Sequence, residues 1–464
     1  MDVAMLWRVR LLNAFVLLVI FVILVFALYP GRFDGDSISQ VLQGTRFQFN
    51  DAHSPGLSLT LGVLADVMPG PAPMFFLQLA IFLGGLFLIT DLVIAEGRQW
   101  AGCAISILAT SPIISFDYVD VQKDALVTSI VVLLFGLGMR WRVRAKPLTL
   151  FEIVLVCALY IFAFNLRENV FFLILLLPIL FMPVNLASWR GATIAVALCL
   201  ASLGVSFIAK KFVDNDLLHA TRGNAIVQLL VFDLAGIASH TETDTSGGLI
   251  PQFRDNVQRC YTPHWWDPFA PWGECREVSA AAGRLMANPA TEDFLVKQWL
   301  RMIASHPIAY LRHRIAYFSC LMRVGCRENH YMSAGLTYLR PWDTANPPRI
   351  SRLGLFLEKI TFFLNDTILA SGWVWFLTLN IQFVVSLRQV FRHGQAGLPF
   401  MVTIMSASAV TYCAAFAIVG IADVSRYLHP VFALALISLP LFVSSVICPT
   451  AVAIRQRLDR VFHA

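Results

Sequence analysis

Residues 29–55, YPGRFDGDSISQVLQGTRFQFNDAHSP, directly follow the first long apolar run of the chain and gather charged groups beside it. Asp34 and Asp36 are separated by Gly35, and Asp51 and His53 close the stretch before Pro55. Glycine lets the backbone turn tightly around the two acids, which would hold a carboxylate at the membrane surface. The stretch therefore predicts an active-site loop, although turn formation or helix capping is what loop aspartates most often do.

The middle of this loop has the spacing of a short helix. Ser37 to Arg46 places Ile38, Val41 and Leu42 on one face and polar side chains on the other, which predicts an amphipathic helix at the membrane edge.

Composition sets the class of protein. Hydrophobic residues make up 58% of the 464 residues, aromatic residues 12% and charged residues only 14%, so the chain has more apolar surface than a soluble core would bury. The net charge of +6 is modest, and the arginines in short connections report membrane orientation and do not form a nucleic-acid-binding stripe. We expect an all-α polytopic membrane protein with no nucleic-acid partner.

Ten apolar stretches are candidate membrane spans, and the first is long enough at ~19 residues to be a transmembrane helix and not a cleaved signal. Their approximate bounds are 11–29, 73–92, 100–116, 124–140, 150–165, 170–184, 191–209, 371–388, 397–419 and 428–447. The apolar stretch 57–68 is too short to cross a ~30 Å hydrocarbon core, so we expect it to lie along the interface.

Ten spans also put the basic cluster at 140–146 and the arginines near both termini on the cytoplasmic side. The chain then divides into a membrane module at 1–209 with its outer loop at 30–70, an outer, mainly helical domain at 210–370, and a second membrane module at 371–464. We expect a bacterial inner-membrane protein with both termini in the cytoplasm.

Four of the nine cysteines fall in the predicted outer domain, where an oxidising compartment favours disulfides. Three connectivities are open. We favour neighbour pairing, with Cys260 joined to Cys275 by a crosslink that stabilises by roughly 3 kcal/mol in the chain-entropy model.

Further polar residues lie at the outer ends of predicted spans, in SFDYVDVQKD (115–124), LREN (166–169) and ADVSRYLHP (422–430). Charges at this depth are costly unless they are paired or hydrated, so their gathering on one side predicts a shared cavity. Lys123, Arg167 and Arg426 would hold a phosphate there, with Asp124, Tyr427, Asp51 and His53 also contacting the substrate. The alternative is that these residues form structural pairs, such as Arg167 with Glu168, or extend to the interface.

The motifs YPGRFDGDSISQ and NDAHSP after the first span, and VQKDALV after the third, resemble the C-type (GT-C) glycosyltransferase superfamily, which includes protein O-mannosyltransferases and aminoarabinose transferases. The resemblance implies a polyprenyl-phosphate-linked sugar donor, transfer at the outer membrane face to a lipid, glycan or protein acceptor, and an acid of the first outer loop as the base. Relatives often carry an Asp-x-Glu or Asp-Glu pair, whereas this chain has Asp34-Gly35-Asp36. Both the identity of the base and the use of a divalent cation are therefore left open.

Between the two acids we choose Asp36 as the base. It precedes the predicted helix Ser37–Arg46, where a cap position would fix its backbone, whereas Asp34 lies in a more mobile turn. A capping carboxylate is, however, occupied by backbone N–H groups, and in that case Asp34 would be the base.

Two other classes of function use similar residues. A lipid-linked sugar transporter or flippase would favour two similar halves and charges near mid-helix, and neither is apparent. A glycan polymerase or ligase also uses outer-loop arginines but is not expected to carry an acidic loop directly after the first span.

Overall fold

The computed structural model describes residues 3–144, 148–182, 186, 188–223, 225–241, 243–326, 351–393 and 397–448, and over these ranges it is helical with no β-strand. Backbone pairing of the β type is limited in these ranges to isolated bridges, such as that between Arg32 and Asp120. Lys146 of the basic cluster and the arginines beyond residue 448, all of which bear on the predicted orientation, lie outside the described residues.

Seven helices in the described ranges are long and apolar enough to cross a membrane, and a bent pair could make an eighth. The chain is thus an all-α polytopic membrane protein. The seven are α1 (Val3–Leu28), α4 (Ala72–Ala95), α7 (Lys123–Arg144), α10 (Trp189–Lys211), α17 (Gly372–His393), α18 (Leu398–Val419) and α19 (His429–Phe442), the last extended by short helices at both ends. The bent pair is α5 (Gln99–Ala109) and α6 (Pro112–Ser115), with a 47° bend at the break.

The predicted count of ten spans is not confirmed, because two of the ten are short in the structure. Helix α8 (Leu150–Leu166) has 17 residues, or about 25 Å of rise. The stretch 170–184 divides into α9 (Phe171–Ile174) and a 3₁₀ turn at Leu177–Phe181, whose first turn contains a proline that has no N–H to donate.

Some spans lie in the interior of the bundle, and others lie at its periphery, where lipid would contact them. About 83% of the apolar span ending at Ile447 is buried, against 17% for the span that contains α10. Helices α4 and α7 cross closely at Gly85, where a Cβ atom would lie 2.6 Å from the backbone nitrogen of Leu133. Glycine at this position therefore sets how near the two helices approach.

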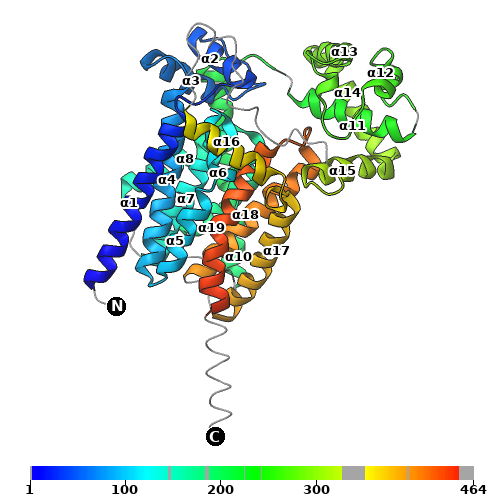
Figure 1. Cartoon of the computed structure of the whole chain (residues 1–464). Coiled ribbons are helices and arrows are strands. Elements are labelled where there is room, and N and C mark those ends of the chain that lie inside the picture. The colour runs from blue at the N-terminus through cyan, green and yellow to red at the C-terminus, as the bar shows by residue number, and fades with distance from the viewer. Residues whose placement is uncertain are drawn as a thin grey trace.

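Two short helices, α2 (Gly35–Arg46) and α3 (Pro55–Val67), cover the end of the bundle opposite the start of α1 (Figure 1). They touch through Gly44 and Gly62, since a Cβ atom on Gly44 would lie 2.8 Å from the Gly62 nitrogen. Helix α3 has 13 residues, about 20 Å, which is too short to cross a membrane. Helix α2 is amphipathic as predicted, but it buries polar Gln40 and Gln43 and leaves Leu42 43% exposed.

The segment after α10 forms a helical group beside the α2 end of the bundle, composed of α11 (Ile226–Thr241), α12 (Phe253–Cys260), α13 (Arg276–Ala287), α14 (Pro289–Ser305) and α15 (Pro307–Leu321) (Figure 1). Neighbouring cysteines are paired there, Cys260 with Cys275 and Cys320 with Cys326, as predicted. Helix α16 (Arg352–Asn365) belongs instead to the bundle, because it packs on α1 and Ser351 donates to the carbonyl of Ala27 at 3.0 Å. Residues 327–350 of the predicted outer domain lie outside the described residues.

Candidate active site

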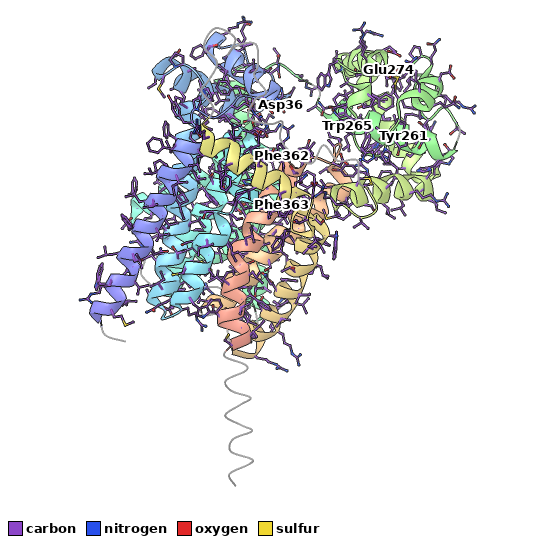
Figure 2. All side chains as sticks on the ribbon, viewed as in Figure 1. Asp36, Tyr261, Trp265, Glu274, Phe362 and Phe363 are labelled. Carbon is purple, nitrogen blue, oxygen red and sulfur yellow. A yellow bond between two sulfur atoms is a disulfide. The ribbon has the colours of Figure 1, made fainter. Side chains whose placement is uncertain are left out.

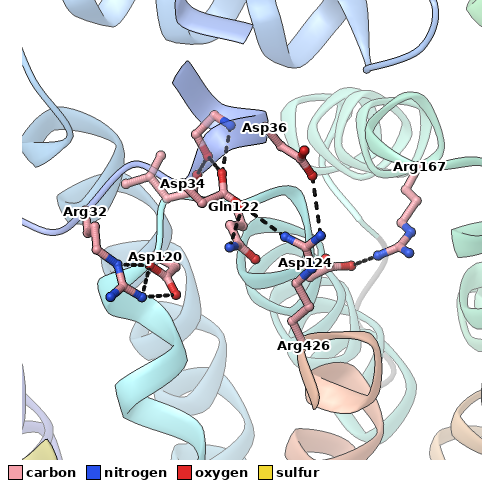
Figure 3. A network of polar contacts seen from close by, with 10 residues as sticks. Arg32, Asp34, Asp36, Asp120, Gln122, Asp124, Arg167 and Arg426 are labelled. Carbon is pink, nitrogen blue, oxygen red and sulfur yellow. Dashed lines mark hydrogen bonds and ion pairs between the residues drawn. The ribbon is translucent and has the colours of Figure 1, made fainter. Parts of the chain in front are cut away.

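The first loop is anchored to the segment before α7 by a buried ion pair. The guanidinium of Arg32 donates to both carboxylate oxygens of Asp120, at 2.6 and 2.7 Å (Figure 3). Backbone bonds on either side, from Arg32 to the Val119 carbonyl at 2.6 Å and from Val121 to the Arg32 carbonyl at 2.9 Å, lock the two segments together. This bidentate pair fixes the position of the backbone that leads into Asp34 and Asp36.

Asp34 is the cap of α2, which corrects the prediction that Asp36 takes this position. The helix begins at Gly35, two residues earlier than predicted, and one Asp34 oxygen accepts from the backbone N–H and the hydroxyl of Ser37 at 2.7 and 2.6 Å. The other oxygen accepts from Gln122 at 2.8 Å and Arg426 at 2.9 Å. With four donors around it, the Asp34 carboxylate is fully engaged.

Asp36 lies in the first turn of α2 (Figure 2) and is much less constrained. Its side chain is 39% exposed, and within the described part of the chain it accepts a single long hydrogen bond, of 3.4 Å, from Arg426. Partial burial disfavours the charged form, but the positive charges of Arg426 and Lys123 outweigh it and hold the pKa of Asp36 below its ordinary value. Asp36 is therefore an ionised carboxylate with free acceptor capacity.

Arg426 lies between the two acids, as Figure 3 shows, and contacts one with each terminal nitrogen. The remaining guanidinium nitrogen, Nε, is buried and has no hydrogen-bond partner among the residues that the structure describes. A single arginine thus orients both carboxylates of the loop.

Arg167 is held from two directions. It forms an ion pair with Asp124, whose side chain is 2% exposed, and its guanidinium lies 4.2 Å from the ring centroid of Tyr427. Tyr427 in turn stacks on Phe416, with ring centroids 5.1 Å apart. Arg167 is thus paired with a carboxylate from α7. The alternative pairing with Glu168 lies outside the described side chains.

A cavity of about 450 Å³ opens beside these groups, within the size range of small-molecule sites. Its polar lining includes Lys123 at the start of α7, Arg167 directly after α8 and Lys210 near the end of α10. Its other walls are largely apolar, with contributions from Leu166, Phe172, Ile226, Leu229, Phe416, Val419 and Ile421. One acid, Asp51, and several neutral polar side chains also line the cavity. Three cations against one acid, together with apolar walls, favour an anion with an attached apolar group.

The three cations differ in how their charge is balanced. Lys210 pairs with Asp214 at 2.7 Å, and Arg167 pairs with Asp124. Lys123 has no hydrogen-bonding or ion-pair partner among the described residues, although Asp36 and Asp124 are close enough to act on its charge. Lys123 is therefore the cation best placed to take up a ligand anion.

Two further predicted substrate-binding residues, His53 and Asp51, also line this cavity. The buried Nδ1 of His53 has no hydrogen-bond partner within the described ranges, and burial lowers the pKa of His53, so that the ring is neutral near pH 7. Asp51 lines it too, but its carboxylate accepts from the backbone of Gly223 and its N–H donates to the Thr221 carbonyl at 3.0 Å. Asp51 thus joins the first loop to the segment after α10.

The structure separates the predicted residues into two groups. Lys123, Arg167, Tyr427, His53 and Asp51 line the cavity. Arg426, Asp34, Asp36 and Asp124 are not among its lining residues, and Asp124 reaches it only through its ion pair with Arg167.

Sequence reasoning missed Lys210, Gln122 and the Arg32–Asp120 pair. Lys210 carried a signal, because a lysine at the outer end of a span is costly without a function or a partner.

One group of three metal-binding side chains lies close together within the described part of the chain, formed by His264, Cys320 and Cys326. Both of its sulfurs are joined in a disulfide. Comparisons with family models, curated proteins and solved structures find no match to this chain.

Proposed function

We propose that this chain is a membrane glycosyltransferase that moves a sugar from a polyprenyl-phosphate donor to a lipid, glycan or protein acceptor, with Asp36 as the base. The observation that carries the proposal is an ionised, half-exposed carboxylate adjoining a cavity lined by three cations and apolar side chains. Lys123 links the two parts, since it lines the cavity and its positive charge acts on Asp36.

The reaction follows from these positions. An acceptor hydroxyl or amine attacks the anomeric carbon of the donor while Asp36 takes up its proton. The bond between that carbon and the phosphate oxygen breaks, and its electron pair stays on the phosphate. Lys123 and Arg167, with Lys210 as the third cation that lines the cavity, stabilise the charge that develops there, because fixed cations at a developing charge lower the barrier.

This assignment changes the role of Arg426. The sequence suggested that Arg426 binds the donor phosphate, but it contacts Asp34 at 2.9 Å and Asp36 at 3.4 Å and does not line the cavity. We assign it to orienting the two acids, with Asp34 as the support through which α2 is capped.

A lipid donor explains the membrane setting. The prenyl chain would remain in the bilayer and its phosphate would rest in the cavity, whose apolar walls come from helix ends at the α2 side of the bundle. The resemblance of the first-loop motifs to GT-C enzymes supports the same donor and leaves room for a divalent cation.

The proposal includes the finer topology. We place the α2 end of the bundle on the outer face of the bacterial inner membrane, with α8 and the broken α9 segment as the two additional crossings and both termini in the cytoplasm. The arginines of short connections on the opposite side favour this orientation.

Binding measurements in lipid nanodiscs test the anion site without knowledge of the sugar. Polyprenyl phosphate should stabilise the protein against heat, whereas the matching polyprenol, which has the same chain without the phosphate, should not. Equal stabilisation by both lipids would show that the cavity does not select for phosphate.

A further inference from the structure

Arg426 follows a turn, residues 420–423, in which every residue is hydrogen-bonded to the helical group α11–α15. The group binds the carbonyls of the first three residues, and it binds both the N–H and the carboxylate of Asp423. The contacts are Arg314 Nη1 to the Gly420 carbonyl at 2.6 Å, Trp266 N–H to the Ile421 carbonyl at 2.9 Å, Tyr317 hydroxyl to the Ala422 carbonyl at 3.1 Å, Asp423 N–H to the His264 carbonyl at 2.9 Å, and His264 Nδ1 to the Asp423 carboxylate at 2.8 Å.

The contacts from Arg314 and Tyr317 are buried, so water does not compete with them, whereas the His264 side chain is 23% exposed. Tyr317 and Asp423 are both 0% exposed. Tyr317 also requires glycine at position 420, since a Cβ atom there would lie 2.0 Å from its hydroxyl. The turn between α18 and α19 therefore takes its conformation from the neighbouring group as well as from its own sequence.

The holding residues are themselves anchored inside the group. Arg314 pairs at 2.5 Å with Asp233 of α11, and the same carboxylate accepts from the indole N–H of Trp299 in α14 at 2.8 Å. Asp233 is 0% exposed, so the ends of these contacts are fixed by the core of the group. Displacing the group would displace the turn.

Three residues beyond Asp423, Arg426 reaches the first loop. It is the residue through which residues 420–428 contact Asp34 and Asp36, at 2.9 and 3.4 Å. The chain of contacts thus runs from the core of the helical group, through the turn, to the carboxylate proposed as the base.

We propose that the helical group α11–α15 aligns Arg426 with the two acids, and that Tyr317 and His264 are positioning residues for Asp36. The proposal rests on the proposed role of Asp36 as the base. It predicts that loosening the turn frees the first loop and changes the protonation of Asp36, whereas simple packing between two parts of the protein would change stability alone.

The direction of the protonation change follows from the charges that face Asp36. These are Arg426, Lys123, His53 and Arg167, of which Arg426 lowers the pKa of Asp36 most, against the opposing effect of burial. Moving Arg426 away should raise the pKa of Asp36, so the acid limb of the transfer reaction should move to higher pH.

Tyr317→Phe and His264→Phe test the proposal in the full-length protein, because each keeps a ring of similar size and removes one bond to the turn. Tyr412→Phe is the matched control, since that hydroxyl is also buried in the described structure but has no hydrogen-bond partner. The readouts are hydrogen–deuterium exchange over residues 34–46 and 420–428, and the pH profile of transfer.

We expect both test variants to exchange about two- to tenfold faster than the control over both ranges, the effect of losing one hydrogen bond. The acid limb should also move upward in both. Faster exchange confined to 420–423, or no change in either range, would overturn the proposal. An inactive wild-type protein would refute the proposed function, while the exchange data would still decide whether the group positions the loop.

Discussion

Asparagine at position 36 should abolish activity and leave stability unchanged, whereas asparagine at position 34 should lower stability. Asp36 is 39% exposed and meets a 31% exposed Arg426 at 3.4 Å, so solvent screens the pair and Asp36→Asn should change the free energy of unfolding by no more than about 0.5 kcal/mol. Loss of a general base typically lowers turnover by about 10²–10⁴-fold. Asp36→Asn should therefore fold normally and be nearly inactive.

Asp34→Asn should instead destabilise. One oxygen faces Gln122 at 2.8 Å and Arg426 at 2.9 Å, and the other faces the Ser37 N–H at 2.7 Å. In either orientation the new amide group points its NH₂ at a donor and leaves that donor unpaired. The cost is about 2 kcal/mol, since asparagine still caps a helix but mismatched buried donors are expensive.

Sugar transfer and thermal unfolding, measured on both variants in the same detergent, separate the two roles. The account requires a large turnover loss at unchanged stability for Asp36→Asn. Near-normal turnover of Asp36→Asn would refute its role as the base, and so would a turnover loss that merely followed the loss of stability.

Three other predictions concern the cavity, the pH dependence and the topology. Lys123→Met should weaken binding of polyprenyl phosphate about ten- to a hundredfold, because it removes a charged hydrogen bond, whereas exposed Lys211→Met should not; equal affinities in a lipid-binding assay would remove Lys123 from the site. Because the pKa of Asp36 lies below its ordinary 3.8 and burial lowers that of His53 below 6.5, a pH–rate profile should be flat through pH 6.5 and fall only in stronger acid, and a step near 6.5 would contradict this protonation scheme. Cysteines introduced at exposed positions of the α2–α3 loop should react with impermeant reagents added from outside, and those at 142–148 only after permeabilisation; the reverse pattern would invert the topology.

The sequence predicted the class of fold well, because long apolar runs are constrained by the membrane more strongly than by local detail. The prediction of individual spans was less reliable where a proline interrupts an apolar stretch of sufficient length. The stretch 170–184 is apolar throughout, yet Pro178 lies where the helix breaks into a 3₁₀ turn. Likewise, 100–116 is bent at the break before Pro112.

The site residues were mostly recognisable, but their partners were not. Composition marks Arg167 and Asp124 as costly in a membrane, but only the packing of α7 against α8 brings them together. The error over the cap of α2 has a local cause. Gly35 and Asp36 both continue the helix, so the boundary falls at Asp34, where Ser37 three residues later supplies the capped N–H. The contacts from α11–α15 to residues 420–423 join positions more than 100 apart in the chain, and no periodicity reports them.

The most direct test of glycosyl transfer is the release of polyprenyl phosphate by the purified wild-type protein. A panel of polyprenyl-phosphate hexoses, pentoses and amino sugars would be incubated with the protein in nanodiscs, with membrane lipid and glycan acceptors present, and the freed lipid phosphate measured by mass spectrometry. The account predicts release from at least one donor and a loss of about 10²–10⁴-fold in Asp36→Asn. Folded wild-type protein that binds polyprenyl phosphate but releases none from any donor would contradict it.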